Sequence, residues 1–173
     1  KIGDVLVLPM AAAMDLSVSL ARQLGVGTAG SAFSIKGFEL DGGVRLEGDK
    51  GYWYASARAT EDARGQVTVA DVELDFAAAD GETRPTRAYH GRVSARVGAL
   101  LPLERQPLGQ APTLSLGEYY RSHTFHGPRL RGIASVEDVG DGHVRGHLST
   151  DLSVDNGEVD VVVIDSSLQL CGY

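Results

Sequence analysis

The apolar residues of this chain change their spacing near residue 30, and this change limits the folds that it can adopt. Between Met10 and Leu24, leucine recurs at every fourth position, which is the period of one face of an α-helix. Beyond it the apolar period falls to two, which predicts consecutive strands at Ile35–Leu40, Val44–Glu47, Tyr52–Arg58, Gln66–Phe76 and Arg87–Arg96. Strands that follow one another favour an antiparallel sheet wrapped on the early helix.

Two local irregularities accompany this pattern. A short strand, Val5–Leu8, precedes the helix and ends at Pro9. Within Gln66–Phe76 the apolar phase slips by one residue between Val69 and Val72, which predicts a β-bulge or a bend in a long strand.

The second half of the chain partly repeats the first. Leu101–Pro112 contains three prolines and indicates a linker. Beyond it we expect a short helix or turn near Gly117–Ser122. Three strands are expected next, at Leu130–Val136, His143–Ser149 and Val159–Ile164, and a final helix begins at Asp165. The sequence therefore predicts an α+β fold of two related units, residues 1–97 and 117–173, joined by a linker over 98–116. The second unit is expected to be incomplete, because no strands follow its helix.

The composition excludes several functions. Asp and Glu outnumber Lys and Arg by 23 to 16 in 173 residues, which gives a net charge of −7. Nucleic-acid binding needs clustered Lys and Arg, so we expect no nucleic-acid partner. No run approaches the roughly 18 consecutive apolar residues of a membrane span, and the first residues lack a signal-peptide pattern. Cys171 is the single cysteine, so no internal disulfide forms, and we expect a cytoplasmic protein.

Some familiar motifs occur in the wrong context. Gly25–Gly30 matches G-x-G-x-x-G, but a helix precedes it and strands follow, whereas a dinucleotide site needs the opposite order. His143 and His147 have the spacing of metal ligands on a helix, but they fall in a predicted strand, and no carboxylate or cysteine cluster accompanies them. No G-x-S-x-G sequence supports a serine hydrolase. We therefore expect no metal and no nucleotide.

The most informative segment is the apolar run that ends at Asp165, with Gln169 four residues further on. On a helix these two side chains share one face. Two interpretations are open: Asp165 caps the helix and does nothing else, or it is an acid at a strand end that the Gln169 amide holds in place.

Two further segments are weak when they stand alone: His126-Gly127-Pro128, which predicts a turn, and the strand that ends at Pro9. In this order, however, the three segments resemble the dehydratase domain of modular type I polyketide synthases. The third motif of that family, D-x-x-x-Q/H, is matched in full by Asp165 and Gln169.

The other two motifs of the family are matched in part. In G-x-x-Y-G-P-x-F, Gly127 and Pro128 match, while His126 replaces the tyrosine and Leu130 the phenylalanine. The first motif is H-x-x-x-G-x-x-x-x-P. When Pro9 is aligned with the motif's proline, Asp4 falls at the glycine position and Gly3 lies beside it. The histidine position then falls immediately before Lys1, outside this sequence.

The resemblance implies a double hotdog fold, in which two antiparallel sheets each wrap a central helix. It also implies the syn loss of water from a β-hydroxyacyl thioester, which gives an α,β-enoyl thioester. The missing histidine would be the base and Asp165 the acid, and burial would favour the protonated carboxyl that an acid needs. Gln169 would orient Asp165, and His126 would either donate to the substrate hydroxyl or shape the pocket.

By the same resemblance, donors around Gly3–Asp4 would bind the thioester carbonyl, and Leu8, Pro9 and Leu130 would line an acyl channel. The substrate would be carried on the phosphopantetheine of an acyl carrier protein, and no other cofactor is implied. Neighbouring synthase domains would be further partners, and a homodimer is left open. A basic patch at Arg129 and Arg131 is expected to dock the carrier.

Three alternatives use the same fold: a double-bond isomerase, a cyclase that forms a pyran ring, or an inactive module that binds acyl chains or supports the synthase. Because the motif's histidine position falls before Lys1 and the strands expected after the second helix are not in the sequence, we expect the sequence to be a fragment or to omit segments.

Overall fold

The computed structural model describes residues 6–28, 31–42, 45–46, 51–62, 64–78, 84–96, 109–124, 126–149 and 160–173. The chain divides into two compact units, one within Asp4–Ala99 and the other built mainly from Leu100–Tyr173. Each unit is described by itself. The predicted site residues Gly3 and Asp4 and most of the predicted linker lie outside the described residues.

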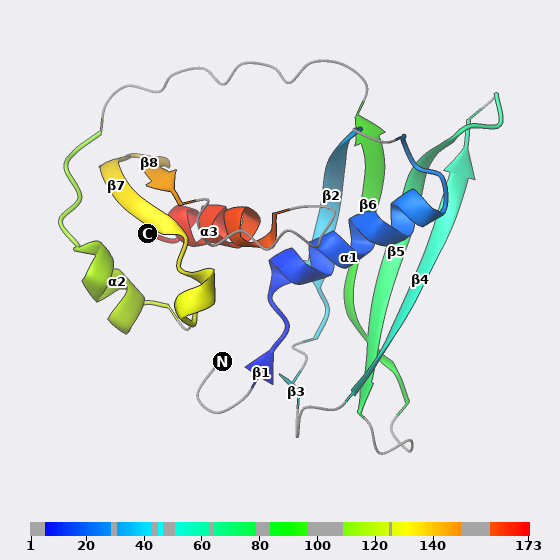
Figure 1. The fold of residues 1–173 in the computed structure, drawn as a ribbon, viewed down its shortest axis with the longest axis horizontal. Helices are drawn as coiled ribbons and strands as arrows, with labels where there is room; N and C mark the ends of the chain where they lie inside the picture. Colours follow the sequence, from blue (N-terminus) through cyan, green and yellow to red (C-terminus); the bar gives the residue numbers. More distant parts are fainter. Residues whose placement is uncertain are drawn as a thin grey trace. The chain divides into compact units, whose positions relative to one another are not determined.

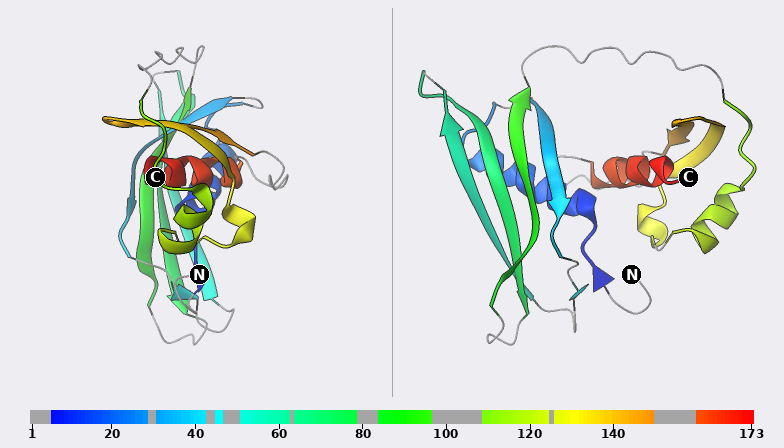
Figure 2. Two further views of the ribbon diagram at one scale, coloured as in Figure 1. Left: turned by 90° about the vertical axis from the view of Figure 1, so that its left-hand side faces the viewer. Right: turned by 180° about the vertical axis from the view of Figure 1, so that it is seen from behind.

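The first unit is a helix on a sheet. Its elements are β1 (Leu6–Val7), α1 (Met10–Gln23), β2 (Ala32–Leu40), β3 (Arg45–Leu46), β4 (Gly51–Glu61), β5 (Val67–Ala78) and β6 (Thr86–Arg96). Four strands form an antiparallel sheet in the order β2-β6-β5-β4, and β1 pairs with β3. Figures 1 and 2 show α1 lying across one face of this sheet. The early helix and the strands that follow it are thus confirmed.

Small side chains, rather than the leucines, form the buried side of α1. Leu16 is 40% exposed and Leu24 39% exposed, whereas the buried positions are Ala11, Ala13, Ser17, Val18 and Ala21. The fully buried sheet residues Val72, Leu74 and Val93 supply the bulk of this core. Because the helix side is small and the sheet side large, the backbone of α1 can approach the strands closely.

The bulge expected between Val69 and Val72 is wrong. The ladder between β5 and β6 runs without interruption through these residues. Ala70 is fully buried and continues the alternation of Val72 and Leu74, so Val69 simply lies on the other face of the strand. The register shifts lie instead opposite Thr60/Glu61 and at Leu74/Asp75 of β5.

The second unit places two helices against a hairpin. Its elements are α2 (Leu116–Ser122), the 3-10 helix η1 (Pro128–Leu130), β7 (Ile133–Gly140), β8 (His143–Leu148) and α3 (Val161–Cys171). Strands β7 and β8 pair antiparallel. Tyr119, Tyr120 and Ile133 form the centre of its core, around which pack Leu114, Leu116, Val136, Leu148, Leu170 and Tyr173.

The entry into β7 differs from the prediction. β7 begins at Ile133 and not at Leu130 as predicted, because Pro128 begins a turn of 3-10 helix that ends at Leu130. Within the described end of the predicted linker, Gln110 forms an isolated antiparallel bridge with Val139. The Gly109 N–H also donates to Asp138 Oδ1 at 3.1 Å, which ties the linker to β7.

The strand expected at Val159–Ile164 is wrong over its described part. Val161 is the first residue of α3, and the Asp160 side chain caps it by accepting the Val163 N–H at 3.0 Å. A run of β-branched residues has low helix propensity, but the cap and the burial of Val162, which is 1% exposed, outweigh it. Asp165 is therefore not the N-cap and lies in the second turn of α3. Among the described helices, none has the length and apolar character needed to cross a membrane.

The cap yields a stability prediction. Asp160→Ala removes the acceptor for the Val163 N–H, so we expect the free energy of unfolding to fall by about 1 kcal/mol in a urea titration. Asp160→Asn keeps a side-chain oxygen and should lose far less. Equal losses in the two variants would contradict the capping role.

Candidate functional site

A buried carboxylate and an amide pair on one face of α3. Asp165 is 4% exposed and Gln169 is 5% exposed, one helical turn apart. The Gln169 Nε2 donates to Asp165 Oδ2 at 2.6 Å. The four-residue spacing brings the two side chains together, because residues i and i+4 are neighbours on a helix.

The same amide also holds the loop before β7. The second N–H of Gln169 Nε2 donates to the Leu130 carbonyl at 2.7 Å, which fixes η1 to α3. Gln169 thus bridges the carboxylate and the Gly127–Leu130 segment with both of its amide hydrogens. Its Oε1 is buried and has no hydrogen-bond partner among the described residues.

His126 faces the same carboxylate. Its Nε2 lies 3.4 Å from Asp165 Oδ2, and its side chain is 15% exposed. Burial lowers the pKa of His126 below its ordinary value, the nearby Asp165 carboxylate opposes this shift, and the Arg131 charge adds to it. The lowered pKa favours a neutral imidazole at pH 7.

The two oxygens of Asp165 differ in their surroundings. Oδ2 accepts from Gln169 and faces His126, whereas Oδ1 makes no hydrogen bond to any residue that the structure describes. A carboxyl group fixed through one oxygen can use the other to give or take a proton. The arrangement therefore suits acid–base chemistry at Asp165 Oδ1.

Two tyrosines of α2 support this arrangement. Ser115 caps α2 by accepting the Glu118 N–H at 3.2 Å. The Tyr119 hydroxyl donates to the Gln169 carbonyl at 2.7 Å, and the Tyr120 hydroxyl accepts the Ile133 N–H at 3.0 Å. Burial raises the pKa of both phenols, so both stay protonated at neutral pH.

A glycine lets the start of β7 approach α3. The Gly132 N–H donates to Ser166 Oγ at 3.1 Å, and Ser166 is fully buried beside Asp165. A Cβ at Gly132 would overlap Ser166 Oγ and would lie 3.0 Å from a methyl group of Val162. Only glycine permits this contact without a shift of the neighbouring atoms.

Sequence reasoning missed these supporting residues. Tyr119, Tyr120, Gly132 and Ser166 lie next to predicted site segments but match no motif. Their partners lie 13 to 50 residues away in the chain, so no local pattern signals the contacts.

The remaining predicted site residues fall in two groups. In the second unit, Leu130 is half-buried at the site, while Gly127 and Pro128 are exposed where η1 begins. In the first unit, the Leu8 carbonyl accepts from the buried Tyr89 hydroxyl at 2.8 Å, and Pro9 is the N-cap of α1. The structure therefore brings together Asp165, Gln169, His126 and Leu130.

Two other histidines of the second unit, His143 and His147, pair with carboxylates of β7. His143 Nε2 lies 3.1 Å from Asp138 Oδ1, and His147 Nε2 lies 2.6 Å from Glu137 Oε1. The hydrogen bond from the Gly109 N–H and the nearby His143 side chain lower the pKa of Asp138. In the described part of the chain, no three His, Cys, Asp or Glu side chains gather as metal ligands.

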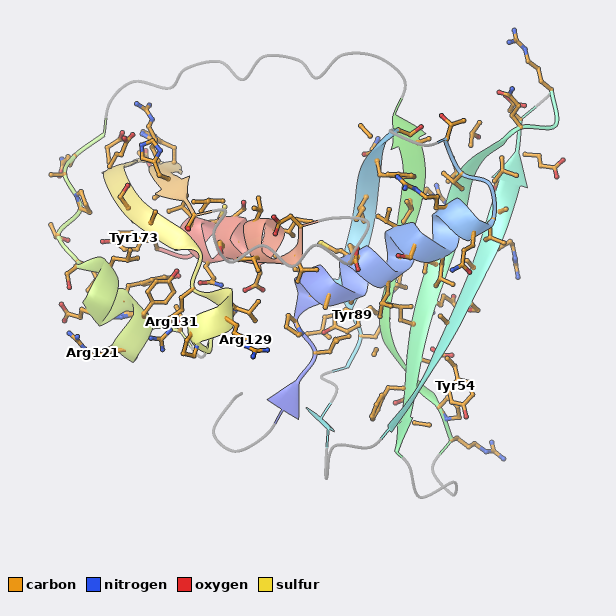
Figure 3. The ribbon with its side chains drawn as sticks, viewed as in Figure 1. Tyr54, Tyr89, Arg121, Arg129, Arg131 and Tyr173 are labelled. Atoms are coloured by element: carbon orange, nitrogen blue, oxygen red, sulfur yellow. The ribbon has the colours of Figure 1, made fainter. Side chains whose placement is uncertain are left out.

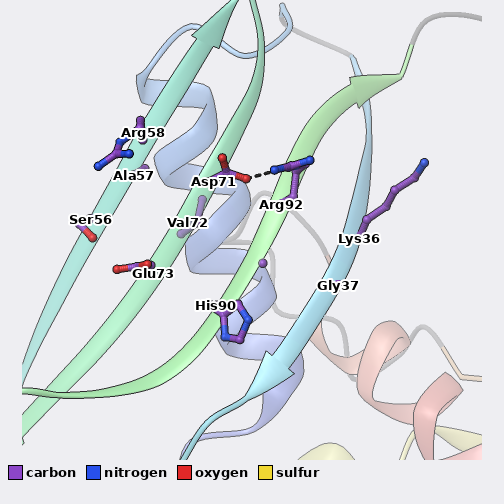
Figure 4. Close-up of a pocket in the computed structure, with 11 residues that line it drawn as sticks. Lys36, Gly37, Ser56, Ala57, Arg58, Asp71, Val72, Glu73, His90 and Arg92 are labelled. Carbon is purple, nitrogen blue, oxygen red and sulfur yellow. Dashed lines mark hydrogen bonds and ion pairs between the residues drawn. The ribbon is translucent and has the colours of Figure 1, made fainter.

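A groove of about 680 Å³ lies on the sheet face of the first unit that α1 leaves open. Figure 4 shows charged side chains of both signs along it, with Arg92 paired to Asp71 at 2.7 Å. None of the predicted site residues lines it. An antiparallel sheet commonly leaves one polar face to solvent, and this groove has that character.

Comparison with known proteins gives a structural match and no sequence match. No family model matches the chain, and no curated protein does. A structure described under dehydratases from type I polyketide synthases matches with a TM-score of 0.72 and 18% identity, over 98% of this chain and 61% of that one. A variant of the PpsC dehydratase domain from Mycobacterium tuberculosis matches with a TM-score of 0.71 and 18% identity, over 96% of this chain and 60% of that one. An isomerase-inactive variant of GphF DH1 matches with a TM-score of 0.64 and 24% identity, over 98% of this chain and 58% of that one.

The chain therefore has the α+β fold of polyketide synthase dehydratase domains over nearly its full length. It spans about 60% of the length of these structures, as their 61%, 60% and 58% coverage shows. At these identities the match defines the fold.

The α2 contact can be tested by stability. Tyr119→Phe removes the hydrogen bond to the Gln169 carbonyl, and we expect the free energy of unfolding in urea to fall by about 1 kcal/mol. Ser167→Ala is the matched control, because it deletes an exposed hydroxyl on α3 that bonds only within the helix. The control should change stability by less than about 0.5 kcal/mol. A Tyr119→Phe variant as stable as the control would contradict the bracing role.

Proposed function

We propose that this chain is part of a dehydratase that removes water from a β-hydroxyacyl thioester carried on an acyl carrier protein. The observation that carries the proposal is the buried Asp165–Gln169 pair, with one carboxyl oxygen held and the other open. The fold match to dehydratase domains supports it. We also propose that the fold is a double hotdog, in which the first and second units are the two halves.

In this mechanism a base removes the α-proton of the acyl group. The electron pair of the broken C–H bond forms the Cα=Cβ bond, and the Cβ–O bond breaks. Asp165 Oδ1 donates its proton to the departing hydroxyl, which leaves as water. In the family motif this base is a histidine, and with Pro9 at the motif's proline the histidine position falls immediately before Lys1.

Gln169 and His126 assist in different ways. Gln169 holds Oδ2 at 2.6 Å, so that Oδ1 is the oxygen that faces the hydroxyl. His126 stands where the family motif has tyrosine, and its neutral Nε2 is placed to hydrogen-bond the carboxyl or the hydroxyl. Both groups act as neutral partners, so neither forces Asp165 to remain ionised.

Activity tests the acid. Asp165→Asn preserves shape but removes the transferable proton, so we expect at least about a hundredfold loss in kcat with a β-hydroxyacyl thioester, read by mass spectrometry as loss of water. The assay uses the intact protein that contains residues 1–173. Asp160→Asn is the control, because it makes the same change on α3 outside the site. Undiminished dehydration in Asp165→Asn would overturn the assignment.

A double-bond isomerase is the second candidate, because one structural match is a variant described as isomerase-inactive. Such an enzyme would move an existing double bond with the same acid and base and would release no water. The position of the double bond in the product, together with the mass change, separates the two reactions. The cyclase and the inactive module remain further alternatives, which ring formation or the absence of turnover would reveal.

Exposed arginines next to the site are proposed to dock the carrier protein. Arg121 lies in the last turn of α2 and Arg129 lies in η1; both are exposed and make no ion pair with any described residue. Figure 3 labels them with Arg131, the third cation of this region. An acidic carrier surface, or the phosphate of its pantetheine arm, is the complementary partner.

Charge reversal tests the docking. Arg129→Glu should raise KM for a carrier-bound substrate severalfold at low salt, because it replaces an attraction with a repulsion. The same variant should leave KM for a short pantetheine thioester unchanged. Equal changes for the two substrates would contradict docking at Arg129.

A further inference from the structure

Arg131 follows η1 and contacts the loop that carries His126. Its Nε donates to the His126 carbonyl at 3.0 Å. Its guanidinium lies over the ring of Tyr120, 5.3 Å from the ring centre. One side chain therefore spans from the His126 backbone to α2, although the sequence had suggested only a docking role for it.

The surface beneath Arg131 is rigid. Tyr120 is 8% exposed, its hydroxyl accepts the Ile133 N–H at 3.0 Å, and its ring packs against Tyr119 at 5.8 Å between centres. A planar guanidinium stacked on a fixed ring loses little further freedom when it donates a hydrogen bond. Arg131 can thus hold His126 at a defined place.

The loop from His126 to Arg131 is fixed at both ends. At one end Gln169 binds the Leu130 carbonyl, and at the other Arg131 binds the His126 carbonyl. Between them the Leu130 N–H donates to the Gly127 carbonyl at 3.0 Å. Without Arg131 the loop would lose the hydrogen bond at the His126 carbonyl, and the 3.4 Å approach of His126 to Asp165 would loosen.

The charge on His126 matters for the acid. A protonated imidazole 3.4 Å from Asp165 would stabilise the ionised carboxylate, which has no proton to donate. Among the described residues, the charged groups that act on His126 are Asp165 from α3 and Arg131 after η1. Burial and the Arg131 cation lower the pKa of His126, against the opposing effect of Asp165.

We propose that Arg131 is a positioning residue that fixes His126 against Asp165 and keeps its imidazole uncharged while the carboxyl serves as acid. This inference rests on the proposed function for its catalytic meaning. The contacts themselves are independent of that function, and so is the first of the two measurements below.

The first measurement is an NMR titration of the His126 ring in the full chain. Arg131→Gln removes the cation and should raise the pKa of His126, because the Arg131 charge disfavours protonation of the ring. Arg131→Lys keeps the charge and should leave that pKa close to the wild-type value. Arg129→Gln removes an exposed charge two residues away and is the matched control, with no shift expected. An Arg131→Gln titration that coincides with this control would overturn the proposal.

The second measurement is the pH profile of kcat with a short thioester substrate. The acidic limb should move to higher pH in Arg131→Gln, while Arg131→Lys should lose about tenfold in kcat without moving that limb, because it cannot hold the loop through a planar fork. Wild-type kcat in Arg131→Lys would overturn the positioning role. If wild type turns over no substrate, the proposed function fails, while the titration still decides whether Arg131 controls His126.

Discussion

The two N–H bonds of the Gln169 amide are the interaction on which the candidate site depends. One reaches Asp165 on the same helix, and the other reaches the Leu130 carbonyl across the unit. Because both donors belong to one amide nitrogen, a rotation of the Gln169 amide would disturb the Asp165 contact and the Leu130 contact together. Tyr119 holds the Gln169 backbone from the opposite side, so the amide is itself held in place.

The neutral character of the partners around Asp165 has a chemical consequence. Amide and imidazole groups can orient a carboxyl group without a formal charge, whereas a salt bridge to Lys or Arg would hold it ionised. The Arg131 side chain is directed to the His126 carbonyl and the Tyr120 ring. Its charge acts on the histidine, where it lowers the pKa of the imidazole.

Sequence patterns gave most of the first unit, because its helix and strands follow local apolar periods. They failed at α3, where the valine-rich run after Asp160 has the composition of a strand. Packing of Val162 and the Asp160 cap decide for the helix, and both effects depend on surroundings that a local window does not contain. The bulge predicted in β5 is wrong for a similar reason. The buried position before Val72 is filled by Ala70, whose small side chain was not counted among the apolar residues that define the period.

By itself the sequence determined that Asp165 and Gln169 share a helix face, since four-residue spacing fixes that geometry once a helix forms. Through the adjacent Gly127–Pro128 pair, the sequence also indicated that His126 occupies a position in a second motif of the family whose third motif contains Asp165 and Gln169. Only the tertiary structure decided that His126 approaches the carboxylate, that Gln169 binds Leu130, and that Arg131 and Tyr119 brace them. Most of these contacts join residues 39 to 50 positions apart, and such pairs are set by how α2, η1 and α3 pack against the hairpin, which no local spacing encodes.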